Sequence, residues 1–436
     1  MDTVNRELSS AGLQESTDGL ADAGLHNDWN YTSDESSSDQ KKKRAVADSH
    51  IATNCSPERA TLIEQSGSSN LAILETSCLQ TPHGKLQKSG IERPSQMAEQ
   101  APGKANNTAE VQIAPADSGV PPRKSQNAAV HWLRRMQRLT RELGEIDPLK
   151  LDRPVRIAVL DTGCDDGVPF FLHPDNRSRL KGWKDWIDHS ETRRDDDGHG
   201  THLVSLIMKA APQVEVYVAR VAKCSQELYK ADRDVAEAIT WAAEECEADI
   251  VSMSFGFADK QPNINKAIRK ALDKREESII FFAAASNSGA NEREMFPAYL
   301  DSVISVRGTN ANGNFEDFNP PRSEGEVAVF GTLGVDVPAA GLAAGEVYKS
   351  GTSVATAVAT GMAGILLAYI NSKSGKYAFD DVKKKLSTCK GMQAMFRHLA
   401  SDTLNCGCLY VTPWSLAGLD DETRWANFVV AMRKVQ

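Results

Sequence analysis

The feature that most constrains the fold of this 436-residue chain is a series of short, uninterrupted apolar runs separated by helical stretches. Strands that are apolar at every position are typical of parallel sheets, because helices cover both faces of such sheets. The sequence therefore predicts an α/β protein with a mostly parallel central sheet and helices on both faces. The predicted strands are 155–160, 214–221, 250–254, 279–285 and 302–306, and the predicted helices are 199–210, 231–246, 263–274 and 352–370.

The composition of the chain divides it into four parts. Residues 1–125 are rich in polar side chains and poor in aromatic ones, so they cannot bury enough apolar surface to offset their ordering entropy. We predict a disordered, low-complexity region there, followed by a helical lead-in at 126–150, where apolar residues recur at helical spacing. The α/β domain is expected at 151–372, and a helical extension packed on it at 373–436.

Charge and cysteine content indicate the compartment and the partners. The net charge of −9 argues against a general nucleic-acid binder, and no stretch reaches the roughly 20 apolar residues of a membrane helix. The eight cysteines form no disulfide or zinc pattern, and no signal peptide is visible. We expect an intracellular protein, cytoplasmic or nuclear, although the basic run 41–44 is explained more simply as solvated charge. Neither nucleic acid nor a membrane is an expected partner.

Three chemically active side chains stand at the ends of predicted elements, in the chain order Asp161, His199, Ser353. A serine hydroxyl becomes a good nucleophile when a base takes its proton, and histidine suits that role near neutral pH. A carboxylate can orient the imidazole ring and stabilise its charged form. Each residue alone has an ordinary explanation, as a turn, a helix start or an N-cap, but none explains the joint arrangement. The set predicts catalysis by an activated serine.

These motifs resemble the three active-site signatures of the subtilisin-like serine peptidases, and they occur in the same order. The signatures are Val-Leu-Asp-Thr-Gly at 159–163, Gly-His-Gly-Thr-His at 198–202 and Ser-Gly-Thr-Ser-Val-Ala-Thr at 350–356. Ser-Met-Ser-Phe-Gly at 252–256 is similar to the substrate-binding strand of that family, and Ala-Ala-Ser-Asn at 284–287 to the segment that ends in its oxyanion-hole asparagine. The resemblance extends over residues 154–367. Without a visible secretion signal, the chain resembles intracellular, fungal-type members of the family.

The resemblance implies a three-layer subtilisin-like fold and a serine endopeptidase that acts on a protein or peptide substrate. In that family's mechanism Ser353 attacks the carbonyl, His199 acts as base and then acid, and Asp161 orients His199. Asn287 stabilises the oxyanion together with the Ser353 backbone N–H. The residues expected to bind the extended substrate backbone are Ser254, Phe255 and Gly256.

Three departures from the family pattern leave a second interpretation open. Ala357 stands where the family usually has proline, Ser286 replaces a glycine before Asn287, and no folded propeptide is evident. A low-activity or inactive module that binds peptides as a regulatory effector is therefore the alternative, and an interaction protein acting through its N-terminal tail is a weaker one. His202 is expected to be a structural neighbour of the site.

No cofactor is expected to be required. The acidic run 195–197 resembles loops that sometimes bind calcium in this family, but the sequence shows no full ligand set. Pairing of these carboxylates with Arg193 and Arg194 explains the run at least as well. The sequence predicts no metal site and leaves the oligomeric state open.

Overall fold

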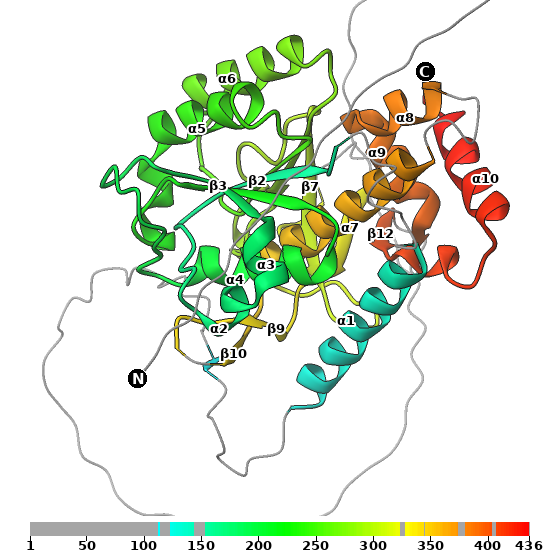
Figure 1. Ribbon diagram of the computed structural model, residues 1–436, viewed down its shortest axis with the longest axis horizontal. Helices are drawn as coiled ribbons and strands as arrows, with labels where there is room; N and C mark the ends of the chain where they lie inside the picture. Colours follow the sequence, from blue (N-terminus) through cyan, green and yellow to red (C-terminus); the bar gives the residue numbers. More distant parts are fainter. Residues whose placement is uncertain are drawn as a thin grey trace, which may run out of the picture. The chain divides into compact units, whose positions relative to one another are not determined.

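The described strands of the computed structural model form two sheets (Figure 1). The structure describes residues 112–113, 123–143, 153–322, 328–343, 345–373, 380–402 and 407–435. Its strands are β1 (Gln112–Ile113), β2 (Arg156–Asp161), β3 (Leu180–Asp185), β4 (Glu215–Arg220), β5 (Ile250–Met253), β6 (Ile280–Ala284), β7 (Val303–Thr309), β8 (Val329–Leu333), β9 (Val337–Ala340), β10 (Glu346–Lys349), β11 (Ala400–Asp402) and β12 (Cys408–Val411). Its helices are α1 (Lys124–Leu143), α2 (Pro169–Leu172), α3 (Pro174–Arg179), α4 (His199–Ala210), α5 (Asp232–Glu244), α6 (Pro262–Lys274), α7 (Thr352–Ser372), α8 (Asp380–Leu386), α9 (Cys389–Leu399) and α10 (Asp421–Met432).

The larger sheet confirms the predicted α/β fold class. Within the described ranges its strand order is β11-β12-β8-β7-β6-β5-β2-β4-β3, and every neighbouring pair is parallel except β11 and β12. The smaller sheet, β1-β10-β9, is antiparallel. Each strand and helix predicted within the α/β domain is present, with ends that differ by a few residues at most. The predicted helical lead-in corresponds to α1, and its residues 144–150 lie outside the described residues.

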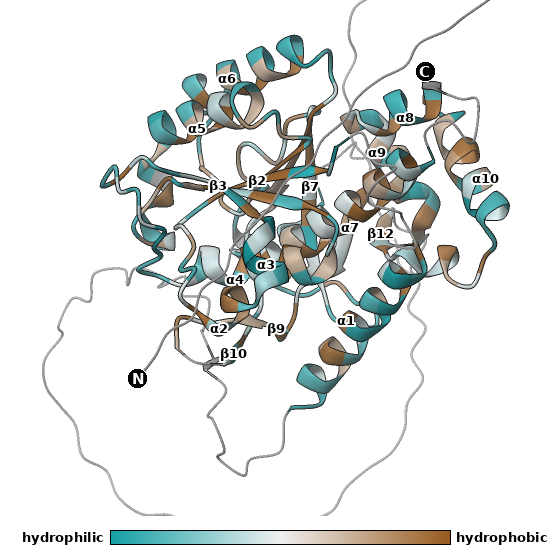
Figure 2. Ribbon diagram, viewed as in Figure 1, coloured by the Kyte–Doolittle hydropathy of each residue, from teal (hydrophilic) through white to brown (hydrophobic). Residues whose placement is uncertain are grey.

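Alternate side chains of the central strands enter two separate cores. Ile157 and Val159 of β2 pack in the core shared with α4 and α7, whereas Ala158 and Leu160 pack in the core shared with α5 and α6. Successive side chains of a strand point to opposite faces, so two covered faces require apolar residues throughout. Figures 1 and 2 show the sheet between α5 and α6 on one side and α4 on the other, with hydrophilic residues along the outer faces of α5 and α6.

Helix α7 runs through the larger core. Every residue from 352 to 370 is buried, which explains why this stretch is apolar all round. Among the described residues it is the single helix long and apolar enough to span a membrane, and its apolar window is wholly buried inside the protein. Its composition therefore follows from its place in the core.

The segments on either side of the predicted α/β domain pack on it and on each other. Trp132 of α1 donates from Nε1 to the Tyr410 hydroxyl at 2.8 Å, and its ring lies edge-on to Trp414 at 5.0 Å. In the C-terminal part, β12 pairs in parallel with β8, so this extension adds strands to the sheet as well as the predicted helices. Tyr369 of α7 stacks on Phe428 of α10 at 5.3 Å.

The predicted disorder of residues 1–125 falls mostly outside the described residues. The basic run 41–44 lies outside them too. Within that part, the structure describes β1, which pairs with β10, and residues 123–125 at the start of α1.

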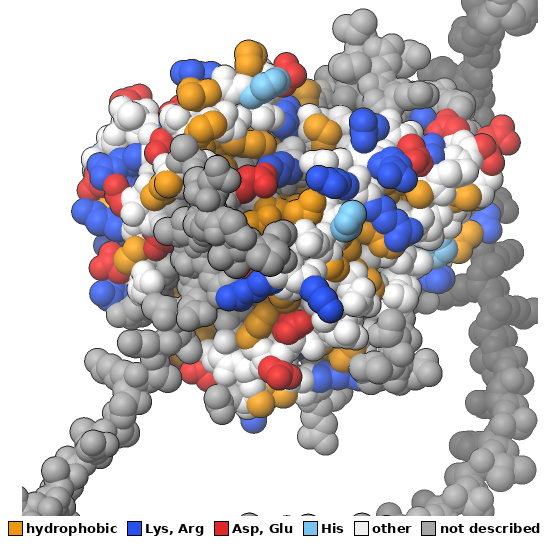
Figure 3. Space-filling view, turned by 90° about the horizontal axis from the view of Figure 1, so that it is seen from below, with side chains coloured by type: hydrophobic (Ala, Val, Ile, Leu, Met, Phe, Trp, Pro, Cys, Tyr) orange, Lys and Arg blue, Asp and Glu red, His pale blue; other side chains and the backbone are white. Residues whose placement is uncertain are grey.

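On the face seen in Figure 3, acidic, basic and hydrophobic side chains are interspersed.

Candidate active site

The parallel strands bring the predicted site residues to one edge of the sheet. In such folds ligands bind at the carboxyl ends of the strands. Asp161 is the last residue of β2, Ser254 directly follows β5, and Asn287 comes three residues after β6. Helices α4 and α7 begin at or next to His199 and Ser353, and return from the same edge.

The loop before α4 is fixed by Asp195, which is only 6% exposed. Its carboxylate accepts hydrogen bonds from Gly198 N at 2.9 Å, Thr201 N at 2.8 Å and Thr162 Oγ1 at 2.9 Å. The first N–H groups of a helix have no acceptor within it, so a carboxylate at this place stabilises the helix start. Asp195 thereby sets the position at which His199 enters the site.

Gly200 allows α4 to pack directly on the turn that follows β2. A Cβ at Gly200 would overlap the carbonyl oxygen of Gly163. The Gly200 N–H also donates to Thr162 Oγ1 at 2.9 Å. Close backbone approach of this kind requires glycine. It brings His199 within reach of Asp161.

Asp161 and His199 form a direct hydrogen-bonded pair. Nδ1 of His199 lies 2.7 Å from Oδ1 of Asp161; the carboxylate is fully buried and the imidazole is 13% exposed. Burial lowers the pKa of His199, but the charge of Asp161 and its hydrogen bond outweigh burial and raise that pKa above the ordinary value of 6.5. With Nδ1 held by the carboxylate, Nε2 is the nitrogen that can exchange a proton.

His202, on the same helix, has a different environment. It is fully buried, and its Nε2 lies 3.1 Å from the carbonyl oxygen of Val337. Burial lowers the pKa of His202 well below 6.5, so the ring is neutral. A carbonyl only accepts, so Nε2 carries the proton and donates it. His202 is therefore a structural residue, as expected from the sequence.

The start of α7 is fixed between two loops. Gly351 has a φ of 142°, in the region that favours glycine, and a Cβ there would lie 3.0 Å from Nδ2 of Asn287. The hydroxyl of Ser254 donates to the carbonyl oxygen of Ser353 at 3.2 Å. Ser353, the second residue of α7, is thus held between the end of β5 and the Asn287 loop.

The amide of Asn287 is oriented by Thr352. Its Oδ1 accepts from the backbone N of Thr352 at 2.7 Å and from Oγ1 of Thr352 at 3.0 Å, which leaves Nδ2 as the amide's donor. Ser286 is not among the residues with positive φ, and its hydroxyl accepts from Ser288 N at 3.2 Å. Ser286, where the family usually has glycine, therefore stabilises a local turn beside Asn287 through its hydroxyl. Ala357, the other departure, is fully buried within α7.

A cavity of about 440 Å³ brings the predicted residues together, since His199, Asn287 and Ser353 all line it. Asp161 does not line the cavity and lies behind His199. The predicted substrate-binding residues, which line the same cavity, are Ser254, Phe255 and Gly256.

Several other residues of this cavity were not predicted from the sequence, and two of them, Met295 and Lys349, matter most for the site. Met295 packs against the backbone of Gly256, where a Cβ would lie 2.5 Å from Cβ of Met295. Lys349, the last residue of β10, lines the cavity near His199. Lys349 directly precedes the 350–356 motif, and this position was the one sign in the sequence that it could belong to the site.

The acidic run 195–197 is engaged by protein donors. Asp196 pairs with Arg194 at 2.6 Å and with the fully buried Arg220 at 2.7 Å. Asp197 accepts from the backbone N of Ser225 at 2.9 Å. In the part of the chain that the structure describes, no group of three or more His, Cys, Asp or Glu side chains is placed to hold a metal ion.

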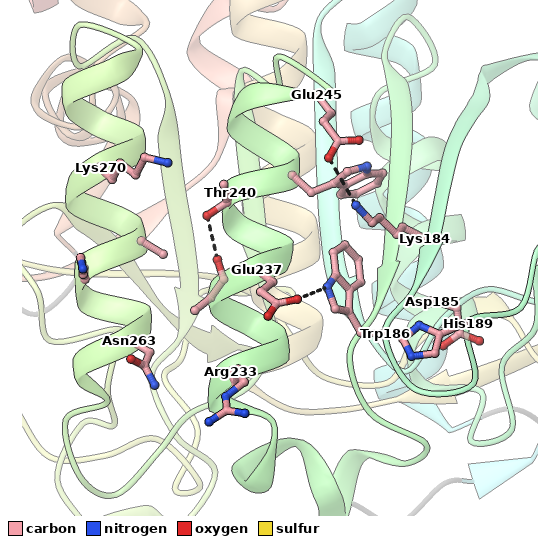
Figure 4. A pocket seen from close by; sticks show the side chains of 14 residues that line it. Lys184, Asp185, Trp186, His189, Arg233, Glu237, Thr240, Glu245, Asn263 and Lys270 are labelled. Carbon is pink, nitrogen blue, oxygen red and sulfur yellow. Dashed lines mark hydrogen bonds and ion pairs between the residues drawn. The ribbon is translucent and has the colours of Figure 1, made fainter.

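A larger cavity of about 680 Å³ lies elsewhere, between β3, α5 and α6 (Figure 4). Some of its polar side chains bond to one another: Lys184 pairs with Glu245 at 3.3 Å, and Trp186 Nε1 donates to Glu237 at 3.2 Å. None of the predicted site residues lines this cavity. We therefore assign the chemistry to the smaller cavity.

The fold and the site define a serine endopeptidase. The chain belongs to the subtilase family, whose sequence model matches residues 152–402. It is 30% identical over 245 residues to thermitase of Thermoactinomyces vulgaris, covering 53% of this chain and 82% of that protein. It is 28% identical to the subtilisin-like protease het-Q2 of Podospora anserina (55% of this chain, 76% of that protein). It is also 28% identical to an intracellular serine protease of Paenibacillus polymyxa (50% and 68%).

Proposed function

We propose that this serine endopeptidase cleaves peptide bonds through a triad of Asp161, His199 and Ser353. The observation that carries the proposal is the Asp161–His199 pair, which opens onto the same cavity as Ser353. The raised pKa of His199 means that the imidazole readily keeps a proton taken from the nucleophile. The proposed reaction needs these side chains, the backbone N–H of Ser353 and water, and it needs no cofactor.

In the first half of the reaction, Ser353 Oγ attacks the scissile carbonyl carbon and its proton passes to Nε2 of His199. The oxyanion accepts hydrogen bonds from Nδ2 of Asn287 and from the backbone N–H of Ser353. That N–H belongs to the first turn of α7, where N–H groups have no acceptor within the helix. His199 then protonates the departing amine, and the carbon–nitrogen bond breaks.

In the second half, water attacks the acyl group on Ser353. His199 takes a proton from the water and returns it to Ser353 Oγ as the acid product leaves. Residues 254–256 would pair with the extended substrate backbone by strand addition, because they follow β5 at the cavity. Phe255, Met295 and Val354 supply apolar lining to the same cavity.

The test is covalent labelling with a fluorophosphonate probe, followed by peptide-library cleavage. Wild type is expected to be labelled on Ser353, and Ser353→Ala is expected to lose labelling and cleavage together. Ser372→Ala, at the far end of the same helix, is the matched control and should behave as wild type. Equal labelling of Ser353→Ala and wild type would refute the assignment. Labelling without any cleavage would favour the alternative of a peptide-binding module with low activity.

We further propose that the enzyme acts inside the cell, in the cytoplasm or nucleus, as an intracellular member of its family. The relatives named as intracellular serine proteases support this location. Imaging of a fluorescent fusion of the full chain tests it, and secretion of the fusion would contradict it. Addition of EDTA to the cleavage assay tests whether a structural calcium ion is needed.

A further inference from the structure

Lys349 is a buried cation in the wall of the cavity that contains His199 and Ser353. The residue is 8% exposed, and its Nζ donates to the carbonyl oxygen of Gly198 at 3.1 Å. An ammonium group has three protons to donate, and a carbonyl oxygen accepts one of them without supplying a full negative charge. Lys349 therefore retains donors after this hydrogen bond is made.

The carboxylates near Lys349 are engaged elsewhere. Asp161 holds His199, Asp195 caps the start of α4, and Asp197 accepts from Ser225 Oγ at 3.0 Å. Among the described residues, none of these acids or any other lies within ion-pair distance of Lys349. Their charges act on it from further away, but burial outweighs them and lowers the pKa of Lys349 below the ordinary 10.5.

A buried charge without a close counterion costs free energy. Such a charge is stabilised when a bound ligand brings an anion to it. The cavity in front of Lys349 is the place where the substrate lies under the proposed function. The substrate is therefore the natural source of the missing anion.

The position of Lys349 indicates which side of the scissile bond lies closest to its side chain. Lys349 bonds to Gly198, the residue before His199, whereas Ser254 bonds to the backbone of Ser353 from the end of β5. His199 delivers its proton to the departing amine, so the leaving segment of the substrate must pass over His199. Lys349 thus adjoins the path of the leaving segment.

We propose that Lys349 binds a substrate carboxylate on the leaving-group side of the scissile bond. The enzyme then prefers peptides that carry Asp, Glu or a terminal carboxylate at the first or second position after the cleaved bond. This inference rests on the proposed function. An ammonium–carboxylate hydrogen bond within a sheltered cavity is among the stronger polar contacts available to a protein.

Matched quenched fluorescent peptides test the preference. Each peptide repeats one sequence cleaved in the library experiment and differs only by Glu, Gln or Lys at the first or second position after the cleaved bond. Peptides that end at those positions with a free or an amidated terminus separate a side-chain carboxylate from a terminal one. Wild type should cleave the Glu peptide with a kcat/KM about tenfold above that of the Lys peptide, which corresponds to about 1.4 kcal/mol.

Three variants at Lys349 assign the preference to this side chain. Lys349→Arg should keep the preference, Lys349→Met should bring the Glu-to-Lys ratio close to one, and Lys349→Glu should reverse it. Lys209→Met is the matched control, because Lys209 pairs with Glu346 and does not line the cavity. It should keep the wild-type ratio.

The outcomes separate this inference from the proposed function. Ser353-dependent cleavage with a ratio near one in wild type would overturn the role of Lys349 and leave the triad in place. The role of Lys349 would also be overturned if Lys349→Met left the Glu-to-Lys ratio of kcat/KM unchanged. The same holds if the acidic preference were confined to positions before the cleaved bond. Equal loss of activity on all peptides in every Lys349 variant, with an unchanged melting curve, would mean that Lys349 supports the active site without recognising the charge of the substrate, and would overturn the inference.

Discussion

His199 and Asp161, 38 residues apart in the chain, meet through Nδ1 and Oδ1 at 2.7 Å. Oδ1 of Asp161 also accepts the backbone N–H of Thr162 at 2.8 Å. The carboxylate is therefore held by its own turn as well as by the histidine. These two contacts give the imidazole one orientation, with Nε2 available to the cavity.

Asp161→Asn should preserve the fold and lower kcat by roughly 10⁴-fold. Asparagine has nearly the same shape as aspartate, so the contacts of Thr162 are kept while the negative charge that stabilises the imidazolium is lost. The measurement is kcat on a cleaved peptide, with circular dichroism as the check of folding. A loss below tenfold in a folded variant would contradict the role of Asp161.

The activity should fall on the acid side with a midpoint above pH 6.5, because the pKa of His199 is raised and only neutral His199 can act as the base. The kcat/KM profile against pH measures this midpoint. Asp161 raises the pKa of His199 and Lys349 lowers it, so Asp161→Asn should move the midpoint to lower pH and Lys349→Met to higher pH. Movement of both midpoints in the same direction would refute this explanation.

The raised pKa of His199 makes the fold more stable at low pH, where the activity is lost. The pKa of His199 in the folded state lies above its value in the unfolded chain, so protonated His199 favours folding. This contribution is fully present below about pH 6.5 and is lost as the pH rises through the folded-state pKa. The pH range of highest activity is therefore not the range in which His199 stabilises the fold.

Most of the fold could be predicted, because strands buried on both faces consist of continuous apolar runs in the sequence. Strand β2 and helix α4 were predicted almost to the residue. β3 was missed because it is an edge strand with exposed Lys181 and Lys184, so its side chains follow neither apolar pattern. β11 and β12 join the sheet through β8, and short strands far along the chain leave no local sign of such pairing.

The site was predictable to the extent that motifs mark it. His199, Asn287 and Ser353 stand in recognisable strings, and the cavity brings them together. The contacts of Lys349 could not be predicted, because its hydrogen bond to Gly198 spans 151 residues and depends on how β10 meets α4. The hydrogen bonds of an acidic run are equally hidden from the sequence until the loop is folded.

Asp195→Ala should destabilise the protein by about 3 kcal/mol or more and lower its activity, because several buried donors lose their acceptor. The donors include the backbone N of Gly198, the backbone N of Thr201 and the hydroxyl of Thr162. Chemical denaturation measures the free energy of unfolding. Asp175→Ala, whose side chain is 88% exposed, is the control and should change little. Equal effects of the two variants would exclude a special role for Asp195.

Gly351→Ala should lower kcat by roughly 10²–10³-fold, the loss typical of a disturbed oxyanion donor. The added Cβ would lie 3.0 Å from Nδ2 of Asn287, and φ at this position is 142°. Gly345→Ala separates backbone strain from this contact, because Gly345 has a φ of 120° but nothing within 4 Å of the added Cβ. If both variants lose kcat equally, the contact with Asn287 is not the cause.

Phe428→Ala should lower the free energy of unfolding by about 3–5 kcal/mol while the remaining folded enzyme keeps its kcat. Phe428 of α10 is fully buried and stacks on Tyr369 of α7 at 5.3 Å, so its removal leaves a cavity beside the helix that carries Ser353. Val430→Ala, on the same helix but 44% exposed, should cost less than about 0.5 kcal/mol. Denaturation curves and active-site titration of each variant give the two quantities separately. Equal stabilities of Phe428→Ala and Val430→Ala would mean that the C-terminal extension is only loosely attached, because a helix that supports the core cannot lose its central aromatic side chain without cost.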